Sequence, residues 1–136
     1  MSTIFTSIIN REIPGHFVYE DEVCIAILDK FPAIEGQTLV IPKAEVDYLF
    51  DLPKDTYQHL LSVAKDTARA LDTVFETERT CVIVEGFEVP HAHVKLYPMP
   101  RGTRSLRDAI VPGVEASDER LAELAEQIKI AIGTVR

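Results

Sequence analysis

Cysteine, positive charge and long apolar runs are all scarce in this sequence. Only two cysteines occur in 136 residues, Cys24 and Cys81, and both lie in apolar, β-branched surroundings where a thiol behaves as a small hydrophobic side chain. This usage favours a reducing compartment, and we expect the cytoplasm. No apolar stretch approaches the roughly 20 residues that cross a bilayer, and residues 1–10 lack the basic and apolar regions of a secretion signal. We therefore expect no membrane partner.

The shortage of basic residues argues against another class of partner. Lysine and arginine number 14 against 22 aspartates and glutamates, which gives a formal net charge of −8. A nucleic acid duplex would be repelled by this charge unless a local basic patch overrode it. Internal repeats, low-complexity tracts and long linkers are also missing. The hydrophobic fraction of 46% is enough for one core, so we expect one domain.

The spacing of apolar residues predicts an α+β fold, because strands arrive in hairpin-like groups around long helices rather than in regular alternation with them. Helical spacing covers 53–75 and the stretch from a Ser117 cap to a stop at Gly133, and 6–10 can form a short helix. The continuous apolar run 80–84 predicts a strand buried on both faces. The other expected strands are 17–20, 23–28, 38–42 and 89–96.

The segment VPHAHVKLYP, residues 89–98, concentrates unusual chemistry on this last strand. Side chains alternate faces along a strand, so His91, His93 and Lys95 share one face while Ala92, Val94 and Leu96 share the core face. The three basic groups would form a row about 13 Å long, which suits a polyanion. Three more cations follow at once, and together these residues indicate a local anion site: Arg101, Arg104 and Arg107.

Two simpler interpretations of the same segment remain open. The basic face can be no more than a solvated sheet surface. A His-x-His pair can also supply two metal ligands, but a third ligand is needed. Tyr97 and Pro98 stand where a cupin-like pattern would place a glutamate, and His16 and His59 are remote in sequence. We therefore expect no metal and no cofactor.

The segment resembles the motif of the histidine triad (HIT) superfamily of nucleotide hydrolases and transferases. That motif alternates three histidines with apolar residues, and residues 91–98 match it except that Lys95 replaces the third histidine. The resemblance continues through 8–14, 26–29 and 39–43. It implies a single HIT-like domain over 1–136, with a core of about residues 3–100 and a C-terminal loop and helix of about 101–136. It also implies an antiparallel sheet with one long central helix and a C-terminal helix, in a homodimer.

The resemblance implies a mechanism as well as a fold. The expected partner is a purine mononucleotide or nucleotide conjugate. The middle histidine, here His93, would attack its α-phosphorus and form a covalent nucleotidyl-histidine. The main-chain carbonyl of His91 would fix the reactive tautomer of His93, and Lys95 would supply positive charge. By the same resemblance, Asp29 matches a position that contacts the ribose and Ile27 matches the wall of the base pocket. The remaining positions assigned to nucleotide binding are Gln37, Gly86 and Glu88.

Several residues depart from the family pattern. Lys95 can stabilise phosphoryl charge but cannot act as an acid or base near pH 7. Gln37 stands where a further histidine is usual. Some members hold zinc at positions that are Thr3, Thr6 and Glu45 here, and we expect no zinc. We therefore expect a phosphohydrolase or nucleotidyl transferase that acts on a phosphoramidate or a dinucleoside polyphosphate. The alternative is a catalytically weak nucleotide-binding sensor or adaptor, and a bare dimer scaffold is a third possibility.

Overall fold

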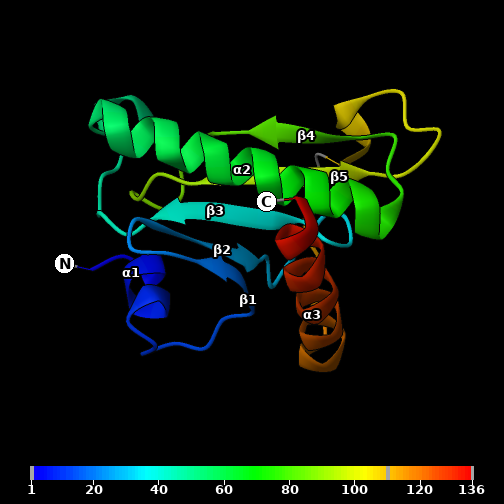
Figure 1. Cartoon of the computed structure of the whole chain (residues 1–136), viewed down its shortest axis with the longest axis horizontal. Coiled ribbons are helices and arrows are strands. Elements are labelled where there is room, and N and C mark those ends of the chain that lie inside the picture. Colours follow the sequence, from blue (N-terminus) through cyan, green and yellow to red (C-terminus); the bar gives the residue numbers. More distant parts are fainter. Residues whose placement is uncertain (1, 110, 136) are drawn as a thin grey trace.

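The computed structural model describes residues 2–109 and 111–135, and it confirms the predicted α+β fold. Five antiparallel strands lie in the order β1-β2-β3-β5-β4 (Figure 1). The strands are β1 (Phe17–Glu20), β2 (Cys24–Leu28), β3 (Thr38–Pro42), β4 (Arg79–Ile83) and β5 (Val94–Met99). The helices are α1 (Ile4–Ile9), α2 (Lys54–Phe75) and α3 (Asp118–Val135), with short 3-10 turns at Leu49–Asp51 and Leu106–Ala109.

The sheet separates two apolar layers. Helices α2 and α3 cover one face (Figure 1), where alternate strand residues such as Ala26, Val40 and Val94 pack on them in the main core. The residues between them in sequence point to the opposite face, where Ile25, Ile27, Leu39 and Ile41 pack against α1. Burying one such aliphatic side chain stabilises the fold by about 1.5–3 kcal/mol. Both faces of β2 and β3 are therefore apolar, while the second face of β5 carries polar groups.

Strand β4 corrects one sequence prediction. The apolar run 80–84 is not buried on both faces, because β4 pairs only with β5 and forms an edge of the sheet. Val82 is 55% exposed and Val84 is 39% exposed. Periodicity cannot distinguish a central strand from an edge strand that leaves apolar residues uncovered.

Several element boundaries also differ from those predicted, by one or two residues for α1, β2 and β4 and with a clear physical reason for β5 and α3. β5 begins at Val94 rather than 89, because the backbone N–H of Ala92 donates to the carbonyl of Val46 (2.7 Å) before the pairing of Val94 with Val40 starts. Helix α3 continues through Gly133 to Val135, so the predicted stop at this glycine is wrong. Glycine weakens a helix interior by about 1 kcal/mol relative to alanine but does not forbid helical backbone. The predicted cap is present, since Ser117 Oγ accepts from the N–H of Arg120 (3.2 Å).

Candidate functional site

The two histidines lie just before β5, on the sheet face opposite α2 and α3. His91 is fully buried and His93 is 6% exposed. Ala92 between them packs into the helix-covered core, so the predicted alternation of faces persists although the strand itself starts later. The ring of Phe5 from α1 contacts both imidazoles edge-on, with a centroid separation of 4.9 Å from His93. Helix α1 therefore helps to fix both rings.

His91 has a hydrogen-bond partner at each ring nitrogen. Its Nε2 lies 2.8 Å from the carbonyl of Pro42, which can only accept, so Nε2 donates. Its Nδ1 lies 2.7 Å from the hydroxyl of Thr3. In the neutral ring Nδ1 therefore accepts from Thr3. Because its ring is buried and both ring nitrogens are hydrogen-bonded, His91 supports the site structurally and does not face solvent.

The orientation of His93 follows from the backbone of His91. Nδ1 of His93 lies 2.8 Å from the carbonyl oxygen of His91 and must donate to it. The lone pair of the neutral ring is then on Nε2, the nitrogen that a nucleophile needs. Burial lowers the pKa of His93; the hydrogen bond to His91 opposes this, and the positive charge of Lys95 adds to it. His93 is consequently neutral near pH 7.

Lys95 shares a face with His93 and is half-buried between its neighbours Leu39 on β3 and Ile83 on β4. Its Nζ lies 2.9 Å from a carboxylate oxygen of Glu85. Burial alone would lower the pKa of Lys95, but the hydrogen bond to Glu85 and nearby negative charge raise it. The ammonium therefore stays charged at neutral pH, and it contributes electrostatically to the site.

Asp29 and Gln37 meet at the far end of the same sheet face. Nε2 of Gln37 donates to Oδ2 of Asp29 (2.9 Å), and Oε1 of Gln37 accepts from the N–H of Ala33 (2.8 Å). The other oxygen of Asp29 accepts from the N–H of Phe31 (2.8 Å). Gln37, assigned to nucleotide contact from the sequence, is buried and orients Asp29 and the loop that follows it. The negative charge of Asp29 raises the pKa of His93 slightly against the effect of burial, so the two residues belong to one electrostatic site.

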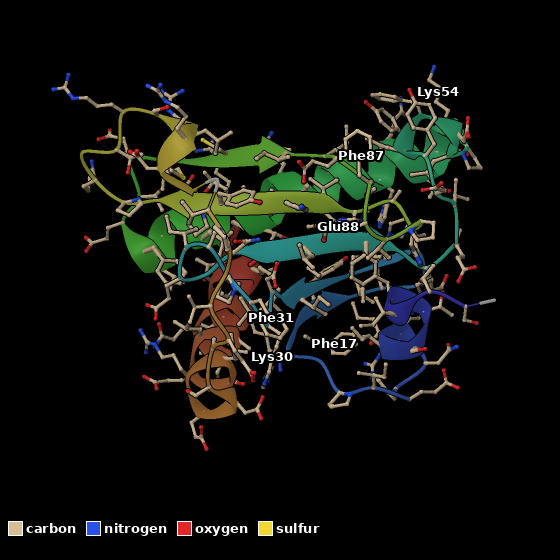
Figure 2. All side chains as sticks on the ribbon, turned by 180° about the vertical axis from the view of Figure 1, so that it is seen from behind. Phe17, Lys30, Phe31, Lys54, Phe87 and Glu88 are labelled. Carbon is tan, nitrogen blue, oxygen red and sulfur yellow. The ribbon has the colours of Figure 1, made fainter. Side chains whose placement is uncertain are left out.

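The remaining sequence-assigned residues border this face. Ile27 is buried in the apolar layer with Phe5 and Leu39, consistent with an apolar wall beside the histidines. Gly86 has a φ of +79°, a conformation that glycine adopts without strain, and it turns the chain between β4 and β5. Glu88 lies on this turn, and its negative charge raises the pKa of Lys95. Figure 2 looks onto the face, with Phe87 and Glu88 on one side and Phe17 and Phe31 on the other.

Thr3, Thr6 and Glu45 form a hydrogen-bonded cluster next to His91. The sequence analysis considered these three residues only as replacements for the zinc ligands of other family members. Thr3, the N-cap of α1, contacts His91 and accepts from the N–H of Thr6 (3.2 Å). Glu45 accepts from the Thr6 hydroxyl (2.6 Å) and from the N–H of Thr3 (2.9 Å), and these bonds lower the pKa of Glu45. Two hydroxyls, a carboxylate and an imidazole already bonded to one another do not fit a structural zinc site, which uses thiolates and imidazoles. The N-cap pattern at Thr3 was the signal available in the sequence.

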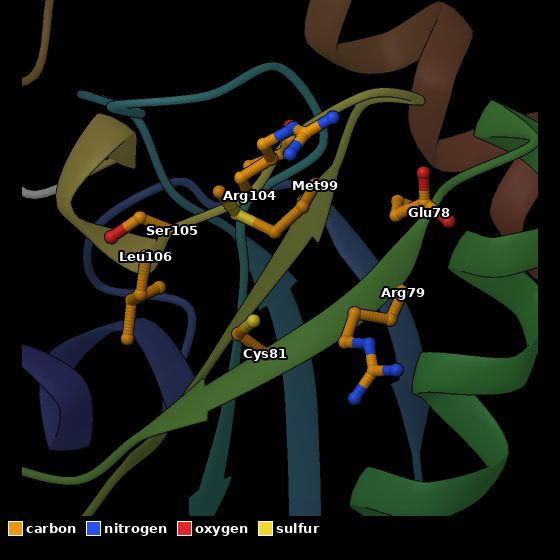
Figure 3. Close-up of a pocket in the computed structure, with 8 residues that line it drawn as sticks. Glu78, Arg79, Cys81, Met99, Arg104, Ser105 and Leu106 are labelled. Carbon is orange, nitrogen blue, oxygen red and sulfur yellow. The ribbon is translucent and has the colours of Figure 1, made fainter.

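The arginines predicted to join the anion site do not do so. Strand β5 carries the chain away from His93, and Nε of Arg101 donates to the carbonyl of Glu76 (3.0 Å) beyond the end of α2. Arg107 donates from Nε to the hydroxyl of Ser105 (3.3 Å). Arg104 lines a cavity of about 340 Å³ at the Met99 end of β5 (Figure 3). The other residues lining that cavity are Glu78, Arg79, Cys81, Met99, Thr103, Ser105 and Leu106.

Residues 111–116 run beside the loop that follows Asp29. The N–H of Ala116 donates to the carbonyl of Lys30 (3.0 Å), and the N–H of Val114 donates to that of Pro32 (3.3 Å). A Cβ at Gly113 would lie 1.8 Å from the carbonyl oxygen of Phe31, so only glycine permits this approach. A cavity of about 120 Å³ lies next to Asp29, with Leu28, Pro32, Glu35, Gly36, Gln37, Ala116, Arg120, Leu121 and Leu124 in its lining. The C-terminal segment thus supports the Asp29 end of the site.

One other group of ligand-type side chains gathers on the opposite side of the sheet. Asp21, Cys24 and His59 bring one ligand atom each within 4.8 Å of one another. His59 Nε2 lies 2.5 Å from Asp21 Oδ2, and the hydroxyl of Tyr19 also donates to that oxygen (2.7 Å). The other oxygen of Asp21 accepts from the N–H groups of Val23 and Cys24. These contacts give the group a structural role in closing the turn between β1 and β2.

Fold and site together define a class of protein, an α+β domain in which a His-x-His pair leads into a central strand of an antiparallel sheet. The HIT domain family model matches residues 10–100. A HIT-like protein of Methanocaldococcus jannaschii is 32% identical over 130 residues, covering 93% of this chain and 98% of that protein. The chain therefore belongs to the HIT family.

Two further comparisons place the chain within this family. The adenosine 5'-monophosphoramidase of Saccharomyces cerevisiae is 32% identical over 127 residues, covering 92% of this chain and 79% of that protein. The crystal structure of a histidine triad nucleotide-binding protein of Sulfolobus tokodaii superposes with a TM-score of 0.85 at 32% identity, covering 96% of this chain and 92% of that one. Among the described residues, no helix has the length and hydropathy needed to cross a bilayer.

Proposed function

We propose that this chain binds purine nucleotides and hydrolyses or transfers the nucleotidyl group at the α-phosphate, with His93 as the nucleophile. One observation carries the proposal: the hydrogen bond from His93 Nδ1 to the His91 carbonyl (2.8 Å) leaves the neutral Nε2 free to attack. The similarity to the yeast monophosphoramidase makes adenosine 5'-phosphoramidate the first substrate to test. Dinucleoside polyphosphates have the same type of reacting phosphorus.

The proposed reaction has two displacement steps. His93 Nε2 forms a bond to the α-phosphorus while the bond from phosphorus to the leaving nitrogen or oxygen breaks, and the leaving group takes its proton from solvent. Water then attacks the nucleotidyl-histidine, giving up a proton, and releases the mononucleotide and a neutral imidazole. Lys95 stabilises charge on the phosphoryl oxygens in both steps, since it is positively charged and shares the face of His93. Asp29 binds the ribose hydroxyls, and Ile27 contributes to the apolar base pocket.

A nucleotide-binding protein without turnover is the second candidate function. Lys95 favours it because an ammonium held charged by Glu85 cannot exchange a proton with the leaving group near pH 7. Binding needs only the charge of this residue, and hydrolysis needs proton transfer as well. The two candidates share one pocket and differ in turnover.

We also propose that the chain forms a homodimer through β4 and acts in the cytoplasm. Strand β4 is an edge strand, and Val82 within it and Val84 just after it are exposed. Soluble proteins usually protect such an edge by pairing or charge. Pairing with the β4 of a second copy would continue the sheet and cover both valines. The cytoplasmic location is supported by two cysteines that form no disulfide.

The experiment that tests the enzyme uses three variants and intact-protein mass spectrometry. Wild type, His93→Ala and Lys95→His are incubated briefly with adenosine 5'-phosphoramidate or a dinucleoside polyphosphate, and released AMP is quantified. We expect a nucleotidyl adduct or steady AMP release in wild type, its loss in His93→Ala, and faster release in Lys95→His. His16→Ala is the matched control, because His16 pairs with Asp118 outside the site (3.1 Å).

Equal release by wild type and His93→Ala would disprove the nucleophile assignment. If neither releases AMP while AMP still raises the melting temperature of wild type, the binding function is the better conclusion.

A further inference from the structure

Glu85 forms an ion pair with Lys95, the cation that shares a sheet face with His93. Its carboxylate lies 2.9 Å from the Nζ of Lys95, and it also acts on His93 through its charge. Glu85 lies two residues beyond the end of β4 and directly precedes Gly86, whose positive φ starts the turn between β4 and β5. The pair therefore joins this turn to the start of β5.

The two partners differ in solvent exposure. The Lys95 side chain is 21% exposed, and that of Glu85 is 53% exposed. A half-buried ammonium without an anionic partner is unfavourable, so Lys95 needs a counter-ion. Glu85 can leave at low cost, because a largely exposed carboxylate recovers hydration and side-chain freedom when it moves into solvent. The geometry thus provides one fixed cation and one displaceable anion.

We propose that Glu85 occupies the phosphate position in the unliganded protein and is displaced when a nucleotide binds. This inference rests on the proposed function, since it places the nucleotide phosphate between Lys95 and His93. Glu85 then determines how strongly the site discriminates by ligand charge. A neutral nucleoside leaves the Glu85–Lys95 pair intact, whereas a nucleoside monophosphate replaces one anion with another at Lys95.

The test is calorimetric titration of wild type, Glu85→Gln and Glu126→Gln with AMP and with adenosine. Glutamine keeps the shape of the side chain but cannot neutralise Lys95. Glu126 is the matched control because its carboxylate also pairs with a lysine, Lys129 (3.9 Å), but on the exposed surface of α3. We expect Glu85→Gln to bind AMP about twofold to fivefold more tightly than wild type, the upper part of the range for losing a partly exposed ion pair. Adenosine affinity should stay the same, and Glu126→Gln should not change AMP affinity measurably.

Salt dependence provides a second readout that a purely structural role would not change. With Glu85 removed, Lys95 is not neutralised before binding, so AMP affinity should fall more steeply with added salt in Glu85→Gln than in wild type. Equal AMP affinity and equal salt dependence in wild type and Glu85→Gln would overturn the inference and leave the proposed function standing. Failure of AMP and adenosine to bind any variant would overturn both.

Discussion

Thr3→Val is the most informative single substitution, because the Thr3 hydroxyl connects the start of α1 to the His-x-His pair of the proposed site. Thr3 is 9% exposed, and its Oγ1 contacts His91 Nδ1 at 2.7 Å and the N–H of Thr6 at 3.2 Å. Valine keeps the shape and removes both bonds. An unsatisfied buried ring nitrogen costs about 1–3 kcal/mol, and a lost N-cap costs about 0.5–2 kcal/mol. We expect unfolding free energy to fall by about 2–4 kcal/mol, and Tm by roughly 6–15 °C.

The same substitution should reduce activity in the folded protein. Without the hydrogen bond to Thr3, the His91 imidazole keeps only its hydrogen bond to the Pro42 carbonyl and is free to rotate about it. The backbone carbonyl of His91 then holds the His93 ring less firmly. We expect kcat/KM for adenosine 5'-phosphoramidate to fall about tenfold, the effect of weakening the positioning of one catalytic group. Nitrogen NMR should detect a single His93 tautomer with the proton on Nδ1 in wild type and a mixture in Thr3→Val.

Two controls separate this effect from a general loss of hydroxyl groups. Thr3→Ser retains both hydrogen bonds and should restore stability, rate and tautomer. Thr73→Val removes a hydroxyl on the exposed side of α2, where it donates to the carbonyl of Arg69 within the same helix (3.2 Å). This variant should change Tm by less than 2 °C, roughly the limit for a surface substitution. If Thr3→Val were as stable and as active as Thr73→Val, the reasoning about His91 would be refuted.

Two further predictions concern stability and assembly. Burial raises the pKa of Asp21, but hydrogen bonds from Tyr19, His59 and two backbone N–H groups lower it well below its usual value. A carboxyl with a lowered folded-state pKa stabilises the protein above its unfolded pKa, near pH 4, and loses this contribution as pH falls further. Asp21→Asn should therefore be about 2 kcal/mol less stable than wild type at pH 7, as measured by urea unfolding. The difference should shrink below about pH 4, and a constant difference from pH 7 to pH 3 would show that the Asp21 carboxylate is not its cause. Val82→Lys on β4 should shift the mass measured by light scattering from two chains to one chain of 15.2 kDa, whereas Ile130→Lys, on the exposed side of α3, should not. A single-chain mass for wild type would exclude the proposed dimer.

The sequence by itself determined the fold class, the strands that flank the site, the long central helix and the His-x-His pair. The sequence was sufficient for the His-x-His pair because extended backbone alternates its side chains between two faces. His91 and His93 therefore lie on the face opposite Ala92 and Val94, whichever strand pairs with this segment. Helical spacing identified α2 equally well. Resemblance to the family added Asp29 and Ile27, which the structure places on the face of His93.

Only the tertiary structure decided which distant groups contact the histidines. Thr3 lies 88 positions from His91, and Glu85 reaches Lys95 across the turn between two strands. Neither contact has a sequence period, since each depends on how α1 and the β4–β5 turn pack on the sheet. The same dependence made β4 an edge strand and carried the three arginines away from the histidines: apolar and charge patterns specify which face a side chain occupies, and packing between elements specifies its neighbours.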